Sequence, residues 1–200
     1  MADYVMLEDI FLSTDNMEII RNNSQNDDGT DTLLGVEWFK FRGVTASNFY
    51  ISGNSWIGIG QNAEQIKISR RDADVFTTRR EEGTLLNTYK FIRFRWEGYS
   101  VHGNFNDSTR LIWDAVFFDT GDIILFIDTI SDNSSNLGEF AFYTKTKTIS
   151  YKGEKGKMIT FLHQDENGDE FILSENPPTF MDPYNRRYLF RDGEGVLYTV

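Results

Sequence analysis

Residues 111–128, LIWDAVFFDTGDIILFID, carry the clearest structural signal in the chain. Two apolar runs flank a four-residue polar connection that contains Gly121, and its length and composition suit a tight turn between antiparallel strands. Short apolar runs of this kind recur along the chain, whereas strong helical spacing of apolar residues is absent. The sequence therefore predicts an all-β protein.

Several other segments share this character. Residues 158–173 and 140–151 are predicted to form two more hairpins, the first of them around the Asn167-Gly168 pair. Residues 33–41 are predicted to be a strand covered on both sides, because Val36, Trp38 and Lys40 alternate with Glu37, Phe39 and Phe41. Further strands are expected near residues 49–52, 56–59, 65–69, 187–191 and 196–200.

The chain has 200 residues, which is enough for one substantial core. Residues 21–32, RNNSQNDDGTDT, contain no apolar side chain and are predicted to be a loop or linker. We expect residues 1–32 to be an N-terminal segment and polar linker, and residues 33–200 to be a single domain. The predicted architecture is an antiparallel, jelly-roll-like β-sandwich whose short N-terminal segment, a helix or a strand, docks on a partner chain.

Composition excludes several classes of function. The formal net charge is −11, and a field of this sign disfavours nucleic acid as a partner. No cysteine is present, which excludes disulfides, thiolate nucleophiles, zinc knuckles and iron–sulfur sites in this chain. We expect no cofactor and no bound metal. The N-terminus lacks a signal-peptide pattern, and no apolar run approaches the roughly 18 residues of a membrane span, so neither Sec-dependent export nor membrane insertion is expected.

Residues 77–96, TTRREEGTLLNTYKFIRFRW, are rich in arginine within this acidic chain. Lys90, Ile92, Phe94 and Trp96 alternate with Phe91, Arg93, Arg95 and Glu97, which is typical of a strand with one apolar face. The first interpretation places the arginines in a solvated row on an outer sheet face. The alternative is a groove in which Tyr89, Arg93, Arg95 and Tyr99 bind a glycan or a neighbouring protomer, because Arg and Tyr are favoured at interfaces.

Other motifs give weaker signals. Asp119-Thr120-Gly121 matches the tripeptide of aspartic proteases, but a hairpin turn accounts for it. The acidic run 165–170 fails the spacing of an EF-hand loop, and a solvated turn is expected there and at residues 26–31, with a weak surface calcium site as the alternative. His102 and His163 are not spaced as metal ligands, and His163 is expected to be structural. A glycosidase pair drawn from Asp72 with Asp74, or Asp165 with Asp169, is a further alternative.

Three stretches carry a resemblance to a known family: ISGNSWIGIG, then QIKISRRDADVFTTRREEGTLLNTYKFIRFRWEGYS, then WDAVFFDTGDIILFID. In this order they resemble β-sandwich domains of bacteriophage tail and fibre proteins and of related phage-like particles. The resemblance covers about residues 52–128. The strand, acidic glycine turn and strand also resemble nidogen-type extracellular domains, although the cysteines common in many of those are missing. No catalytic residue carries over from either family.

The phage resemblance implies a non-enzymatic virion protein that mediates particle assembly or host-surface glycan recognition. Its expected partners are other virion proteins and further copies of itself, with a trimer as the guess, and its expected location is the virion, after synthesis in a bacterial cytoplasm. A glycan hydrolase on the same scaffold and a cytoplasmic interaction domain of the host are the alternatives.

Overall fold

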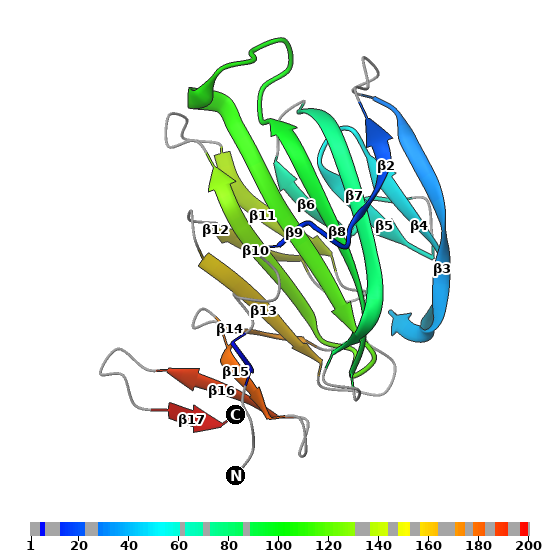
Figure 1. Cartoon of the computed structure of the whole chain (residues 1–200), viewed down its shortest axis with the longest axis vertical. Helices are drawn as coiled ribbons and strands as arrows, with labels where there is room; N and C mark the ends of the chain where they lie inside the picture. The colour runs from blue at the N-terminus through cyan, green and yellow to red at the C-terminus, as the bar shows by residue number, and fades with distance from the viewer. Residues whose placement is uncertain are drawn as a thin grey trace.

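A computed structural model describes the protein at residues 5–6, 13–22, 28–60, 63–69, 73–85, 89–130, 137–143, 148–152, 157–163, 171–174, 178–182, 187–191 and 197–199. Nearly all of these residues lie in strands, and two antiparallel sheets pack face to face (Figure 1). The all-β antiparallel sandwich predicted from the sequence is confirmed.

One sheet has seven strands in the order β14-β13-β10-β9-β8-β7-β2. Their bounds are β2 (Glu18–Asn22), β7 (Asp74–Leu85), β8 (Tyr89–Tyr99), β9 (Arg110–Phe118), β10 (Ile123–Ile130), β13 (Lys157–His163) and β14 (Phe171–Ser174). A short 3-10 helix, η1 (Asp107–Thr109), precedes β9.

The other sheet has six strands in the order β12-β11-β6-β5-β4-β3. They are β3 (Thr30–Phe41), β4 (Val44–Ser52), β5 (Trp56–Ile59), β6 (Ile66–Ser69), β11 (Leu137–Tyr143) and β12 (Thr148–Lys152). The runs β3-β4-β5-β6 and β7-β8-β9-β10 are meanders, in which each strand pairs with the next one in the chain. This order differs from the two Greek keys of a jelly roll.

A third, four-stranded sheet has the order β1-β15-β16-β17 and lies near both chain ends (Figure 1). Its strands are β1 (Val5–Met6), β15 (Pro178–Asp182), β16 (Arg187–Arg191) and β17 (Leu197–Thr199). The described part of the N-terminal segment thus pairs within its own chain at β1, and it also joins the sandwich at β2, which pairs with β7. Residues 21–22 belong to β2 and residues 30–32 to β3, so the loop predicted for residues 21–32 is wrong at both of its ends. The sandwich therefore includes strands before residue 33.

The three predicted hairpins are present as antiparallel pairs, β9 with β10, β13 with β14 and β11 with β12. In the first of them the turn after Phe118 is closed by the Phe118 amide, which donates to the Asp122 carbonyl at 3.0 Å. Gly121 has φ of 89°, a conformation that glycine adopts without strain. The Asp119-Thr120-Gly121 tripeptide therefore forms a turn, as expected. The connections at residues 164–170 and 144–147 lie outside the described residues.

The core lies between the two large sheets and is rich in aromatic rings. Phe39 and Phe49 of the six-stranded sheet contact Phe117 of the seven-stranded sheet, with ring centroids 5.3 and 5.6 Å apart. Trp96 and Trp113 stack on neighbouring strands at 4.0 Å, and the Trp113 indole donates to the Ser55 hydroxyl at 2.9 Å. Such buried aromatic surface is the main favourable term in the stability of a domain this size.

Strand β3 corrects one prediction. Its pairing with β4 shifts between Val36 and Lys40, which is a β-bulge, and the shift puts Val36, Phe39 and Phe41 on the buried side. Glu37 and Lys40 are exposed, so aromatic residues do not cover both faces equally. The bulge breaks the strict alternation on which the prediction depended.

Gly98 on β8 is required by the packing of its neighbour. A Cβ at this position would overlap the Asp74 carbonyl oxygen and the Val75 Cα of strand β7. The absent side chain lets the two strands approach at the irregularity between Val75 and Thr77, where the register of β7 shifts against β8.

Candidate functional site

The arginines predicted to form an outer row are buried. Arg93 is 0% exposed and Arg95 6% exposed, although both point away from the aromatic core, on the face of β8 opposite Ile92, Phe94 and Trp96. The solvated outer row predicted from the sequence is therefore wrong. The outer face of the seven-stranded sheet is covered where these residues lie.

Both arginines converge on one carboxylate. Asp114 on β9 is 0% exposed; its Oδ1 accepts from Arg93 Nε at 2.7 Å and its Oδ2 accepts from Arg95 Nη1 at 2.7 Å. The register explains the meeting, because Arg95 is directly opposite Asp114 and Arg93 lies two residues away on the same face. We call Arg93, Arg95 and Asp114, with the carboxylates and carbonyl that contact them, the arginine–carboxylate network.

The remaining donors of the network are satisfied at its rim. Arg95 Nη2 donates to Asp128 Oδ2 at 2.5 Å, and Arg95 Nε donates to Glu97 Oε1 at 3.1 Å. Arg93 Nη1 donates to the Ser13 carbonyl at 2.8 Å and lies 3.4 Å from Glu81 Oε2. Buried charges are tolerated when they are paired and hydrogen-bonded in this way.

The N-terminal residues form part of the cover. The stretch that leads into β2 crosses in front of β9 and β8 before β2 runs along β7 (Figure 1). Met17 is buried, and the Ser13 carbonyl reaches Arg93. Residues 13–17 therefore cover part of the network within their own chain, whereas the sequence predicted that the N-terminal segment docks on a partner chain.

Burial and charge oppose each other at Asp114. Burial raises the pKa of the Asp114 carboxyl to about 6, against the two guanidiniums, which lower it. Burial also opposes the charge of Arg95, but Asp114, Asp128 and Glu97 outweigh it and raise the pKa of that guanidinium. The carboxylates of Asp114, Asp128, Glu97 and Glu81 neutralise the two guanidiniums inside the protein.

The four residues predicted to line one groove do not share a site. Tyr89 is buried at one end of β8 and Tyr99 is half-buried at the other, ten residues away, which is roughly 33 Å along an extended strand. Arg93 and Arg95 lie together between them, inside the network. Tyr99 instead belongs to a surface cluster with Phe76, Phe105 and Arg110.

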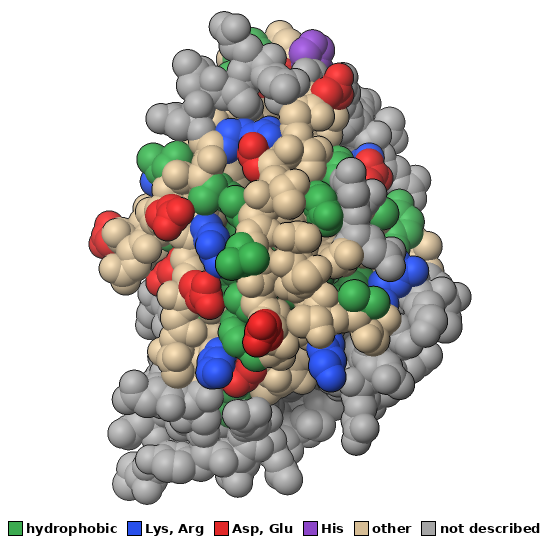
Figure 2. All heavy atoms as spheres, turned by 90° about the vertical axis from the view of Figure 1, so that its right-hand side faces the viewer, with side chains coloured by type: hydrophobic (Ala, Val, Ile, Leu, Met, Phe, Trp, Pro, Cys, Tyr) green, Lys and Arg blue, Asp and Glu red, His purple; other side chains and the backbone are tan. Residues whose placement is uncertain are grey.

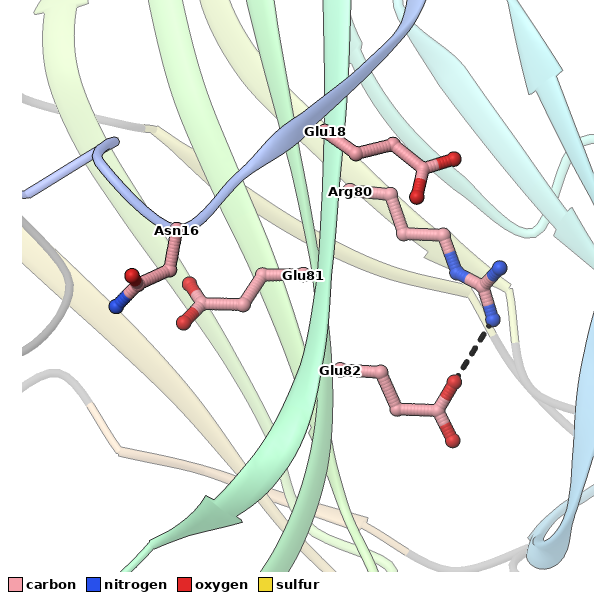
Figure 3. A pocket seen from close by; sticks show the side chains of 5 residues that line it. All are labelled: Asn16, Glu18, Arg80, Glu81 and Glu82. Atoms are coloured by element: carbon pink, nitrogen blue, oxygen red, sulfur yellow. Dashed lines mark hydrogen bonds and ion pairs between the residues drawn. The ribbon is translucent and has the colours of Figure 1, made fainter.

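A pocket of about 240 Å³ lies beside β7 and β2, lined by Asn16, Glu18, Arg80, Glu81 and Glu82 (Figure 3). Glu18, Arg80 and Glu82 project to one side of β7, and Glu81 and Asn16 project to the other. Arg80 Nη2 donates to Glu82 Oε2 at 2.9 Å, so this carboxylate is held by its own strand. Among the lining residues, Arg80 and Glu82 therefore form an ion pair, and Glu18 and Glu81 are the other two carboxylates.

The other candidate residues have ordinary roles where they are described. Asp74 accepts from the Gly103 amide at 2.6 Å and lies 3.1 Å from His102 Nδ1, and the side chains of Asp72, Asp165, Asp169 and His163 lie outside the described residues. Within the described ranges, no group of three or more His, Asp or Glu side chains could hold a metal ion. No described helix is long and apolar enough to cross a membrane.

Comparisons with models of protein families, with curated proteins and with solved structures found no match.

Proposed function

We propose that the chain is a non-enzymatic structural protein of a bacteriophage virion, associated with the tail, that serves particle assembly or contact with host-surface glycan. The resemblance of residues 52–128 to tail and fibre sandwich domains gives the class. The partners would be other virion proteins and further copies of the chain, with a trimer as the expected state.

One observation carries the non-enzymatic part of this proposal. The charged residues with the least exposure in the described part of the chain, Arg93, Asp114 and Arg95, bind one another and the Ser13 carbonyl. A catalytic acid or base must reach a substrate proton within hydrogen-bond distance. Here the buried charges bind each other, and Arg93 holds the Ser13 carbonyl against the sheet. A rigid structural role of this kind is what we expect of a component of an assembly.

Copurification tests the proposal. Particles from an induced or infected culture are banded by density and probed with an antibody against the chain, together with native mass spectrometry of the recombinant protein. Signal in the particle band and a closed homo-oligomer are expected. A chain that stays in the soluble fraction while particles band without it would support the alternative, a cytoplasmic interaction domain of the host.

The second candidate is a glycan hydrolase, which the glutamates around the pocket favour. Incubation with bacterial surface polysaccharides separates the two activities, because a hydrolase releases reducing ends and a binding module does not. Release that is lost in Glu18→Gln or Glu82→Gln, at unchanged thermal stability, would overturn the non-enzymatic proposal. Binding without release would support it.

A further inference from the structure

The loop between β8 and β9, residues 100–109, is held in one conformation by its own hydrogen bonds. The Ser100 amide donates to the Thr109 carbonyl at 2.8 Å, and Thr109 Oγ1 donates to the carbonyls of Asn104 and Asn106. The side chain of Asn106 caps η1 by accepting from the Ser108 amide at 2.9 Å. The loop projects from one end of the sandwich (Figure 1), and these hydrogen bonds preorganise its backbone.

Asp74 fastens this loop to the sheet. Its two oxygens contact the Gly103 amide at 2.6 Å and His102 Nδ1 at 3.1 Å. Gly103 has φ of 69°, a left-handed conformation that lets the chain reverse at this point. The tip of the loop therefore keeps a fixed position relative to strand β7.

Three aromatic rings meet beneath the loop. Phe76 of β7, Tyr99 of β8 and Phe105 of the loop lie edge to face in every pair, with ring centroids 5.2 to 5.5 Å apart. The guanidinium carbon of Arg110 lies 5.2 Å from the centre of the Tyr99 ring. We call Phe76, Tyr99, Phe105 and Arg110 the aromatic cluster.

The aromatic cluster is open to solvent at Phe105, which is 56% exposed. An exposed ring of this size on a rigid loop is unfavourable in the isolated protein. The other exposed large hydrophobic residues of the described chain, Ile19, Leu34 and Val44, are aliphatic. The side of the molecule that carries β2 and β3 shows charges of both signs with scattered hydrophobic side chains (Figure 2). The cluster differs from these because it combines ring faces, a cation and polar side chains at one point.

We propose that the aromatic cluster is a carbohydrate-binding site, in which a pyranose ring packs on the exposed face of Phe105 and its hydroxyl or carboxylate groups bind Arg110 and His102. A sugar ring has an apolar face of C–H groups and a polar rim, and an aromatic ring beside fixed hydrogen-bonding groups complements both. Arg110 suits a carboxylate-bearing sugar in particular, because a guanidinium binds a carboxylate with two parallel hydrogen bonds. No carboxylate of the described residues forms an ion pair with Arg110. This inference rests on the proposed function, since it names the ligand class of host-surface contact.

The experiment uses an array of bacterial O-polysaccharides and capsular polysaccharides, both neutral and uronate-containing, followed by titration of the retained glycans with the full chain. We expect retention by wild type, a loss of affinity of roughly tenfold or more in Phe105→Ala, and preserved binding in Phe105→Trp. Leu34→Ala, which also truncates a highly exposed side chain, is the matched control and should bind as wild type does. A stronger loss in Arg110→Gln for uronate glycans than for neutral ones would identify the acidic class.

The outcomes separate this inference from the proposed function. If the chain bands with particles but no glycan is retained, or if Phe105→Ala binds as wild type does, the carbohydrate site is overturned while the virion role stands. If Phe105→Ala instead abolishes incorporation into particles, the cluster is a protein interface. If glycans bind through Phe105 but particles lack the chain, the virion role fails and the site stands.

Discussion

Replacing Arg93 with methionine tests whether the arginine–carboxylate network holds the fold together. Methionine keeps much of the length of the side chain but removes the donors to Asp114, to the Ser13 carbonyl and to Glu81. Because Arg93 and Asp114 are both 0% exposed, the loss leaves a buried carboxylate with one guanidinium instead of two. Breaking a buried pair in this way costs about 3–5 kcal/mol.

Urea unfolding followed by tryptophan fluorescence measures this cost. With an m-value of about 2–3 kcal/mol per M, the midpoint should fall by roughly 1–2.5 M. Arg80→Met is the matched control, because the Arg80–Glu82 ion pair is partly exposed and such pairs contribute about 0–1 kcal/mol. Adding Asp114→Asn to Arg93→Met should recover part of the loss, since it removes the buried charge that Arg93 neutralised.

Two results would refute this reasoning. If Arg93→Met unfolds within about 1 kcal/mol of wild type, the network does not stabilise the fold, whatever its geometry. If the urea midpoint of the Arg80→Met control falls as far as that of Arg93→Met, losing any arginine from these strands destabilises the fold, and burial is not the cause.

The other predictions concern pH, two glycines and one buried hydroxyl. Burial raises the pKa of the Asp114 carboxyl from 3.8 to about 6 in the folded protein. The contribution of this carboxyl to the unfolding free energy is therefore complete below about pH 4 and falls by about 3 kcal/mol as the pH rises through 6. In a urea series from pH 4 to 7.5, the unfolding free energy of wild type minus that of Asp114→Asn should decline with rising pH. In Gly98→Ala the new Cβ overlaps the Asp74 carbonyl oxygen of β7, and the free energy of unfolding from thermal melts should fall by about 3 kcal/mol or more. In Gly103→Ala the new Cβ meets no atom within 4 Å, so the loss should be only the strain of a positive φ, about 1 kcal/mol. Ser55→Ala removes the hydroxyl that accepts from the buried Trp113 indole at 2.9 Å and should cost about 1 kcal/mol, read from the same melts.

The strands and hairpins could be predicted because their signals are local. Apolar runs on both sides of residues 119–122 fix the β9–β10 hairpin, and they do not depend on the rest of the molecule. Strand β7 gave no such signal, because its sequence, DVFTTRREEGTL, is mostly polar. It forms a strand because β8 pairs with it along its whole length, which is information that lies outside the segment.

The site was predicted less well for a different physical reason. Alternation assigned Arg93 and Arg95 to the face opposite Ile92 and Phe94, but alternation does not say whether that face is covered. A usable signal lay on the neighbouring hairpin: its continuous apolar runs put Val116 and Phe118 on the same face as the arginines, and both are buried. Continuous apolar runs are typical of strands buried on both faces.

Asp114 is the residue from which the network could have been inferred. A single carboxylate within an apolar run is costly unless cations reach it, and the adjacent strand offers two arginines at the spacing of one strand face. Because these charges are neutralised internally, changes at Arg93 should lower stability without altering ligand affinity in the molecules that remain folded. Phe105 lies outside the network, and its ring contacts only Phe76 and Tyr99 among the described aromatic rings, so its removal should alter affinity and lower stability by about 1–2 kcal/mol. That loss is smaller than the one expected for Arg93→Met, so a Phe105→Ala variant as unstable as Arg93→Met would mean that the loop and the network are coupled through β8.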